Sequence, residues 1–194
     1  MKRVLKIIGM ALLLIVLSPF LLLGGYLVVV CVPKLNDIGV RIEESSFEDR
    51  NVSENARELI RASIGDDFRL NSYVASQLMY EYQRDKSGFV KARHFQWVGW
   101  LAFAELFLND DEIYTLFSYF VYNGSGRGLN ELALRLFSKP LSELTLEQLA
   151  EVVAVTKAPS YLLAKPERLQ TARNALLKKV RENAYNKAFN ADSL

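Results

Sequence analysis

Apolar positions follow two patterns along the chain, an unbroken run at the N-terminus and periodic stripes after it. The run occupies residues 7–33, with no charged side chain between Lys6 and Lys34. Roughly 26 helical residues at about 1.5 Å each reach about 39 Å, more than the ~30 Å hydrocarbon core of a bilayer. We therefore predict one transmembrane helix within residues 1–33, with tilt or a bend near Pro19 absorbing the excess length.

Charge on either side of this run predicts its orientation. Lys2, Arg3 and Lys6 precede it, which favours a cytoplasmic N-terminus and places residues 34–194 outside the cytoplasm. The valines at 28–30 form a poor signal-peptidase site, so we expect the anchor to be retained. The same valines make Cys31 a poor lipidation site, and we interpret it as an apolar residue at a helix end.

Periodicity in residues 34–137 predicts loops and helices. Residues 34–54 are polar and acidic with little periodicity, which indicates loop and short turns. Ser53 can cap a helix near 54–63, and a second helix is expected over about 71–84, where Val74, Leu78 and Tyr82 recur. Further helices are expected from Asn109 or Asp110 to about 121 and near 128–137, separated by the glycine-rich stretch "YNGSGRG".

The stretch between them, residues 89–108, is apolar on nearly every side. It contains "FQWVGWLAFAELFL", which is too short to span a membrane on its own. Such a helix is either buried in a core or pressed on lipid. We favour a buried central helix, separated from the preceding one by "RDKSG".

The C-terminal third carries marked helix starts and stops. Thr145 and Gln148 form a capping box, Pro159 ends that helix, and Pro166 suits the first turn of the next. Each helix has an apolar stripe, and we expect the two to pack together: Leu146, Leu149, Ala150, Val153 and Ala154 against Leu169, Ala172, Leu176, Leu177 and Val180.

Composition narrows the class further. The chain has 194 residues, 51% of them hydrophobic and 24% charged, which suits one mainly α-helical domain behind an anchor. A net charge of +2 with scattered basic residues excludes nucleic acid as a partner. Cys31 is the only cysteine, so the chain has no internal disulfide.

A resemblance to a family extends these patterns to function. The stretches "DEIYTLFSYFVYNGSGRGLNELALRLFSK" and "LRLFSKPLSELTLEQLAEVVAVTKAPSYLLAKPERLQTARNALLKKV" resemble the closing part of the peptidoglycan glycosyltransferases, which are the transglycosylase domains of penicillin-binding proteins and their monofunctional relatives. The order of elements agrees over most of residues 43–180. The resemblance implies a two-lobed, lysozyme-like helical domain over residues 34–194, whose cleft binds lipid-linked peptidoglycan precursor and glycan strands beside the bacterial inner (plasma) membrane. It also allows a divalent cation, and the sequence itself indicates no cofactor.

The family's first motif is represented by "EESSF". The resemblance places Glu43 at the position of the glutamate that takes a proton from the acceptor sugar. A carboxylate suits this role where burial raises its pKa. The alternative is a solvated acidic cluster of Glu43 with Glu44, Glu48 and Asp49, and the residues leave the two interpretations equal.

The second and third motifs match less well. "LNSYVASQL" retains only Ser72 and Gln77 of the second motif, and the ordinary interpretation is that Ser72 begins a helix and Gln77 faces water. "RHFQW" retains Arg93 of the third, with His94 in place of a lysine and Trp97 in place of a glutamate. Losing one such charge-stabilising group costs roughly 2.7–4 kcal/mol of transition-state stabilisation.

Three functions remain open at this level. The chain is a peptidoglycan glycosyltransferase with Glu43 as base and Arg93, Ser72, Gln77 and His94 at the substrate, a relative that binds precursor with catalysis lost, or a scaffold for other cell-wall proteins. We favour the family's role in cell-wall synthesis, with catalysis weak or lost.

Overall fold

The computed structural model describes residues 2–83 and 92–191. Within them the chain is helical, and extended pairing is confined to one isolated bridge between Tyr122 and Arg127, so the mainly α-helical class is confirmed. In chain order the elements are α1 Lys2–Tyr26, η1 Leu27–Cys31, η2 Val32–Lys34, α2 Leu35–Glu44, α3 Phe47–Arg50, α4 Glu54–Ile64, α5 Asp67–Gln83, α6 Arg93–Phe107, α7 Asp110–Phe120, α8 Leu129–Phe137, η4 Leu141–Glu143, α9 Leu146–Val155, α10 Pro159–Leu163 and α11 Pro166–Ala191.

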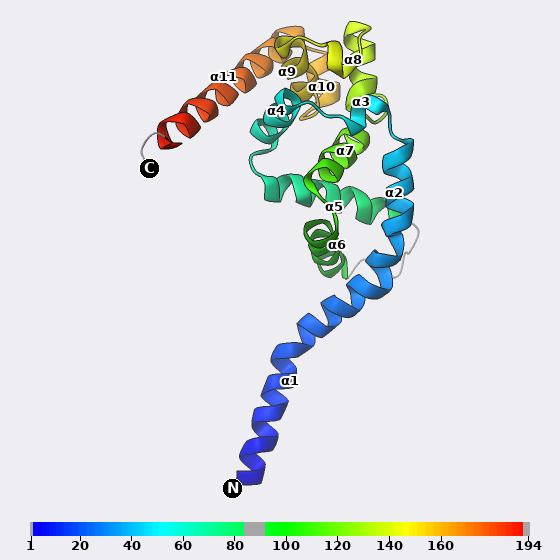
Figure 1. Ribbon diagram of the computed structural model, residues 1–194, viewed down its shortest axis with the longest axis vertical. Helices are drawn as coiled ribbons and strands as arrows, with labels where there is room; N and C mark the ends of the chain where they lie inside the picture. Colours follow the sequence, from blue (N-terminus) through cyan, green and yellow to red (C-terminus); the bar gives the residue numbers. More distant parts are fainter. Residues whose placement is uncertain (1, 84–91, 192–194) are drawn as a thin grey trace.

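The N-terminal helix projects alone from the rest of the molecule (Figure 1). Its most apolar stretch has a mean hydropathy of 2.6 and buries none of its residues in the molecule, so this helix is long and apolar enough to cross a membrane. α1 bends part-way along its length (Figure 1), and we attribute the bend to Pro19, which lies inside the helix and lacks a backbone N–H.

Residues 35–44 form a helix, so the prediction of loop and short turns for them is wrong. α2 continues from α1 through η1, a short π-helical segment, and η2, a 3₁₀ turn. Its apolar side consists of Leu35, Ile38 and Ile42, which pack against the core. Only three apolar residues mark that side among charged neighbours, which is why the periodicity was too weak to identify the helix.

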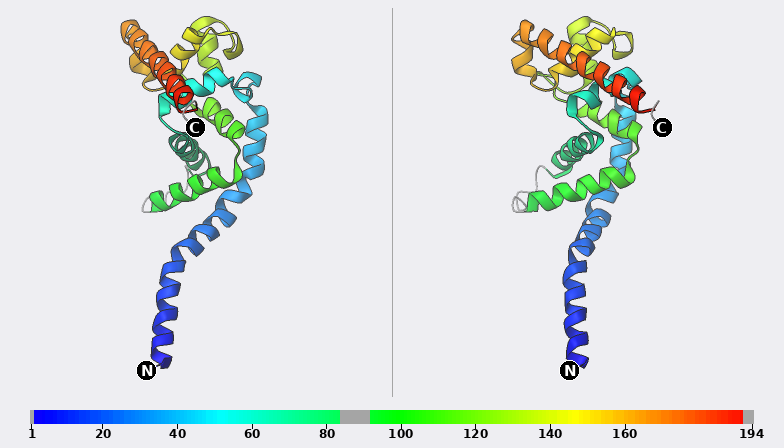
Figure 2. Two further views of the ribbon diagram at one scale, coloured as in Figure 1. Left: turned by 60° about the vertical axis from the view of Figure 1, so that its left-hand side comes forward. Right: turned by 90° about the vertical axis from the view of Figure 1, so that its left-hand side faces the viewer.

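The remaining helices form two layers joined by α7 (Figures 1 and 2). In the layer nearest α1, α5 packs against α6. In the layer farthest from α1, α4, α9 and α11 pack against one another, and α8 packs on α9. α7 contacts α5 in one layer and α8 in the other, so it connects the two layers.

Helix starts agree with the capping signals in the sequence. Ser53 caps α4, Asn109 forms a capping box with α7, and Thr145 forms one with Gln148 in α9. α5 begins at Asp67 rather than near 71, because the side chain of Asp66 accepts a hydrogen bond from the backbone N–H of Arg69 at 2.8 Å. The expected separator at 84–88 and the residues at 89–91 lie outside the described part of the chain.

The C-terminal stripes pack together as expected, with two corrections. Leu149 and Val153 of α9 and Leu169, Leu176 and Leu177 of α11 are buried. Leu146 remains 39% exposed because it occupies the first residue of α9, at the edge of the layer. α9 ends at Val155, and Pro159 begins α10 instead of ending α9, since proline is favoured in the first turn of a helix.

α6 is buried on one side and exposed on the other, so the expectation of a buried central helix holds for one side only. Gly99, Trp100 and Phe103 face the core, whereas Val98 and Leu106 are exposed. The reason is position: α6 lies at the end of the domain next to α1, where α5 and η1 cover one side of it (Figure 2).

Candidate functional site

The candidate base Glu43 lies on α2 and is exposed. Arg41, two residues earlier, points toward α5, and two helical residues rotate the side chain by about 200°. Glu43 therefore faces away from the side of α2 that packs on the domain. The burial that would suit a general base is not present around it.

Asp49, the last member of the expected acidic cluster, is buried and only 6% exposed. Its carboxylate accepts hydrogen bonds from the Ser46 hydroxyl at 2.7 Å, the Ser118 hydroxyl, and the backbone N–H of Asn130 at 3.3 Å. The interpretation as a solvated cluster is therefore wrong for Asp49. This side chain ties α3 to α7 and α8.

The two residues retained from the second motif lie on α5. Ser72 lies inside this helix rather than at its start, and its hydroxyl oxygen is buried without a hydrogen-bond partner in the described part of the chain. Gln77 is half-buried. The Ser72 hydroxyl therefore faces the interior in this conformation.

The residues of the third motif open α6. Arg93 is exposed, and its guanidinium carbon lies 5.7 Å from the centre of the Tyr80 ring on α5. His94 is exposed as well. Trp97 is half-buried and packs against the hydrophobic core.

Among the residues matched to the three motifs, Arg93 lies near the C-terminal turn of α5, and Glu43 lies on α2 next to that turn. Tyr80 of that turn lies under Arg93, and the adjacent Glu81 pairs with Arg41 of α2. Glu43 itself points elsewhere. The described structure therefore does not gather Glu43, Ser72 and Arg93 into one site.

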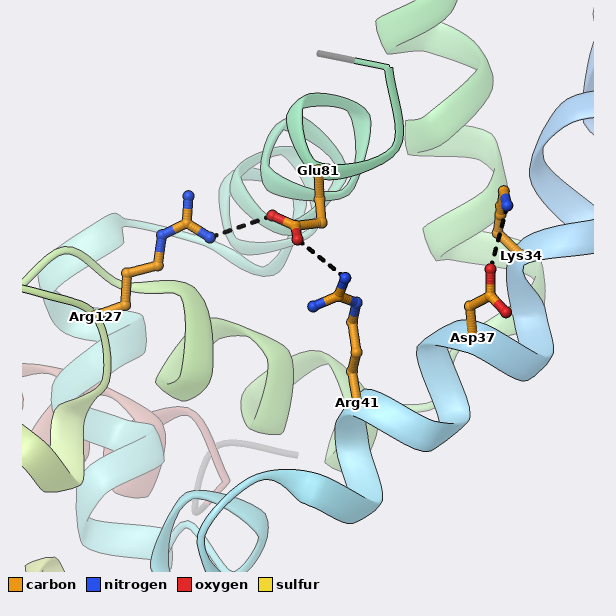
Figure 3. A network of polar contacts seen from close by, with 5 residues as sticks. All are labelled: Lys34, Asp37, Arg41, Glu81 and Arg127. Atoms are coloured by element: carbon orange, nitrogen blue, oxygen red, sulfur yellow. Dashed lines mark hydrogen bonds and ion pairs between the residues drawn. The ribbon is translucent and has the colours of Figure 1, made fainter. Parts of the chain in front are cut away.

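A different cluster occupies the side of α5 that faces α2 (Figure 3). The carboxylate of Glu81 lies 3.0 Å from a guanidinium nitrogen of Arg41 and 3.4 Å from one of Arg127. Lys34 of η2 and Asp37 of α2 form a pair at 3.1 Å. We call these five residues the cationic cluster, because it contains three cations for two carboxylates.

Aromatic rings support the cations of this cluster. The ammonium of Lys34 and the guanidinium of Arg41 lie 5.4 and 5.7 Å from the centre of the Tyr82 ring, and Arg127 lies 5.7 Å from that of Phe120. Burial raises the pKa of the Tyr82 hydroxyl, with the charge of Arg41 acting in the opposite direction. Burial likewise raises the pKa of the nearby Tyr73, against the charge of Arg127. Both phenols therefore stay neutral at physiological pH.

The turn that carries Arg127 is held by the buried side chain of Asn123. Its oxygen accepts the backbone N–H groups of Ser125 at 3.2 Å and Gly126 at 2.9 Å, and its amide donates to the Gly128 carbonyl at 3.2 Å. Gly128 has φ of 108°, a conformation that glycine adopts without strain. The position of Arg127 is thus set by its local turn and not by Glu81 alone.

Arg41, Glu81 and Arg127 were not identified from the sequence. Arg41 fell in a segment predicted to be loop, and Glu81 is one of many charges on a helix surface. The glycine-rich turn was a signal for a fixed loop at Arg127. No sequence pattern indicated that the three side chains meet, because they come from segments far apart in the chain.

The described residues contain no cluster of metal-binding side chains. Among residues 2–83 and 92–191, no three His, Cys, Asp or Glu side chains gather closely enough to hold one. Glu81 has two guanidinium groups beside it, which repel a cation.

No protein-family model and no curated protein matches the sequence.

Proposed function

We propose that this chain is a single-pass membrane protein whose peptidoglycan glycosyltransferase-like domain binds lipid-linked peptidoglycan precursor, with catalysis weak or lost. The observation that carries this proposal is the position of the cationic cluster. Its first member, Lys34, is the first charge after the apolar helix, and Arg41 of α2 and Arg127 meet at Glu81 beside it (Figure 3). In the proposed orientation, the N-terminus lies in the cytoplasm and the domain lies on the outer side of a bacterial inner (plasma) membrane.

The chemistry of the precursor suits this arrangement. A lipid-linked disaccharide-peptide carries a diphosphate at the membrane surface and carboxylates beyond it. Guanidinium groups bind such anions through two parallel hydrogen bonds, and these charge-assisted bonds are among the stronger ones. In the free protein the carboxylate of Glu81 pairs with the guanidinium groups of Arg41 and Arg127. An anionic ligand therefore has to compete with this carboxylate for the two guanidinium groups.

The division of the domain into two layers supports the two-lobed, lysozyme-like architecture of the family. The α5–α6 layer lies near the membrane anchor, and the α4–α9–α11 layer lies away from it. We propose that these layers are the two lobes, with α2 and the 121–128 turn at their common side, where Glu81 pairs with Arg41 and Arg127. Glycan strands then extend from the membrane along this side.

Weak or lost catalysis follows from three placements. Glu43 is exposed and turned away from the cationic cluster, the Ser72 hydroxyl faces the interior, and Trp97 stands in place of a carboxylate. Each missing charge-stabilising group costs about 10²–10³ in rate. A domain with these losses retains binding more readily than turnover.

The test uses the full chain in lipid nanodiscs with labelled lipid-linked disaccharide-peptide. We expect measurable binding, a several-fold loss with Arg127→Ala and with Arg93→Ala, and little or no polymer. Arg168→Ala is the matched control, because Arg168 lies on α11 at 5.5 Å from the Tyr161 ring centre, far from the cluster in sequence and in the fold.

Two results would change the assignment. Robust polymer that Glu43→Gln abolishes and Glu44→Gln spares would establish an active enzyme with Glu43 as base. Absence of precursor binding by the unmutated chain would favour a non-catalytic accessory or scaffold protein. That alternative has one observation behind it: the aromatic pair Tyr185 and Phe189 is exposed on the part of α11 that extends beyond the domain (Figure 2).

A further inference from the structure

An apolar surface lies at the end of the domain from which α1 leaves. Phe95, Val98 and Leu106 project from the outer side of α6, and Phe68 projects from the neighbouring α5. Leu106 is 70% exposed and Phe68 58% exposed. We call these four residues the α6 face. Figure 2 shows α6 next to the end of α1 and running across its direction.

Close contacts join α6 to the end of α1. The Tyr26 ring rests on Gly99 so tightly that a Cβ atom there would lie 2.4 Å from a Tyr26 ring carbon. The same ring meets Phe95 edge-on with 5.5 Å between ring centres, and the Gln83 side chain donates a hydrogen bond to the Tyr26 hydroxyl. These contacts fix the height of α6 relative to the anchor.

That height can be calculated from the apolar run. If Lys6 marks the cytoplasmic boundary of the hydrocarbon, the roughly 20 residues from there to Tyr26 rise about 30 Å, which is the thickness of the hydrocarbon core. Tyrosine is enriched at this boundary. Tyr26, and the α6 residues packed on it, therefore lie where acyl chains meet headgroups on the outer side.

A groove runs between α5 and α6 on the same surface. Phe68, Val98, Leu101 and Ala102 form its walls. The polar groups at its edge already have partners: Asp67 pairs with Arg61 at 2.9 Å, and Glu105 accepts a hydrogen bond from Asn71 at 2.8 Å. The walls are thus apolar, and the carboxylates at the edge limit how deeply the surface can enter a bilayer.

We infer that the α6 face is immersed in the outer boundary of the membrane that α1 crosses, and that the groove holds the acyl chain of a membrane lipid. This inference rests on the membrane anchoring in the proposed function. The continuity of the face with the anchor at Tyr26 determines the occupant, because lipid already surrounds the chain at that height. Exposed apolar side chains that are grouped, rather than scattered singly, mark interaction surfaces. The domain is therefore held by two contacts with the membrane, a span and a shallow surface.

The experiment measures lipid contact at single positions of the full chain in phospholipid vesicles. An environment-sensitive fluorophore is attached at Leu106→Cys or at Val98→Cys, in a Cys31→Ala background, with nitroxide lipids as quenchers. Ile15→Cys on α1 is the positive control, and Leu134→Cys on α8 is the matched control, an exposed leucine in the layer away from the membrane.

We expect labels at Leu106 and Val98 to emit at shorter wavelength than the label at Leu134 and to be quenched at least about twofold by nitroxides near the top of the acyl chain, as for a surface immersed about 5–10 Å. The unlabelled variants are checked by thermal unfolding against the unmutated chain. Quenching at Ile15 with none at Leu106 and Val98 overturns this inference and leaves the anchor intact. A blue-shifted but unquenched label at Leu106 means that another protein copy covers the face, which also overturns it. No quenching at Ile15 overturns the anchoring itself.

Discussion

The two layers of the domain are built from similar core contacts and differ in what they expose. In the layer away from α1, the outer side of α11 carries Arg168, Lys178 and Arg181, all exposed. In the layer next to α1, the outer side of α6 carries Val98 and Leu106. A helix buries one side in either case, so the difference lies in the solvent that meets the other side.

Inside the layers the contacts between helices are of similar kinds. α9 and α11 are linked by an ion pair between Arg173 and Glu151 at 3.3 Å. In the other layer, Tyr82 of α5 stacks on Trp100 of α6 with 5.7 Å between ring centres, and the Asn71 side chain of α5 donates a hydrogen bond to Glu105 of α6 at 2.8 Å. Each layer thus combines buried apolar side chains with polar contacts at its edge, and the two layers differ in the side that faces outward.

The largest expected effect is on the layer away from the membrane. Leu149→Asp places an uncompensated charge in the interface of α9 with α11, where Leu149 is 4% exposed, and we expect it to destabilise the domain by about 3–5 kcal/mol. Thermal unfolding of the full chain in detergent micelles measures it. Leu146→Asp is the control, since this leucine of the same helix is exposed and the change should stay within about 0.5 kcal/mol. Equal effects of the two would contradict the packing of α9 on α11.

The next effect concerns the link between the layers. Asp49→Ala removes the acceptor for Ser46, Ser118 and the Asn130 backbone N–H, and we expect a loss of about 1.5–3 kcal/mol because buried donors are left without partners. The same unfolding measurement applies. Glu48→Ala is the control, since its carboxylate accepts one exposed backbone N–H, from Ser142 at 3.2 Å. A loss no larger than that of the control would show that Asp49 does not hold α3 to α7 and α8.

A third substitution tests the junction of the membrane-side layer with the anchor. Gly99→Ala brings a methyl group against the Tyr26 ring, and we expect a loss of about 1–3 kcal/mol from overpacking. Gly39→Ala is the matched control, because it is also a helical glycine but has open space around its Cβ position. This control should gain about 0.4–1 kcal/mol through reduced freedom of the unfolded chain. Opposite signs for the pair, read from unfolding midpoints, would confirm the contact that fixes the height of α6.

The smallest expected effect is on the cationic cluster. Glu81→Gln removes the charge that Arg41 and Arg127 share, and we expect a loss below about 1 kcal/mol because all three side chains remain partly exposed. Binding should move the other way: without the competing carboxylate, the affinity for inorganic diphosphate should rise, as measured by calorimetry. Weaker diphosphate binding by Glu81→Gln would contradict an anion site at the two arginines.

Local physical chemistry in the sequence determined most of the elements. A charge-free apolar run predicted the N-terminal helix, and the Ser53, Asn109 and Thr145 caps marked helix starts, because a cap depends on side chains within three residues of one another. The apolar stripes on α9 and α11 predicted that these two helices pack together, because each stripe likewise depends on residues close together in the chain. The helix at 35–44 was not predicted, because its few apolar residues form no clear periodic pattern by themselves. Only their contact with the core shows that they share one side of a helix.

Tertiary structure alone decided the candidate sites. Glu43 matches a motif in sequence, yet its exposure and direction depend on how α2 lies on α5 and α7. Arg41, Glu81 and Arg127 form a cluster because three distant segments fold together. Which side of α6 is covered depends likewise on Tyr26, more than 60 residues earlier in the chain. Such pairings depend on the path of the whole chain, and no local pattern of hydrophobic and polar residues specifies them.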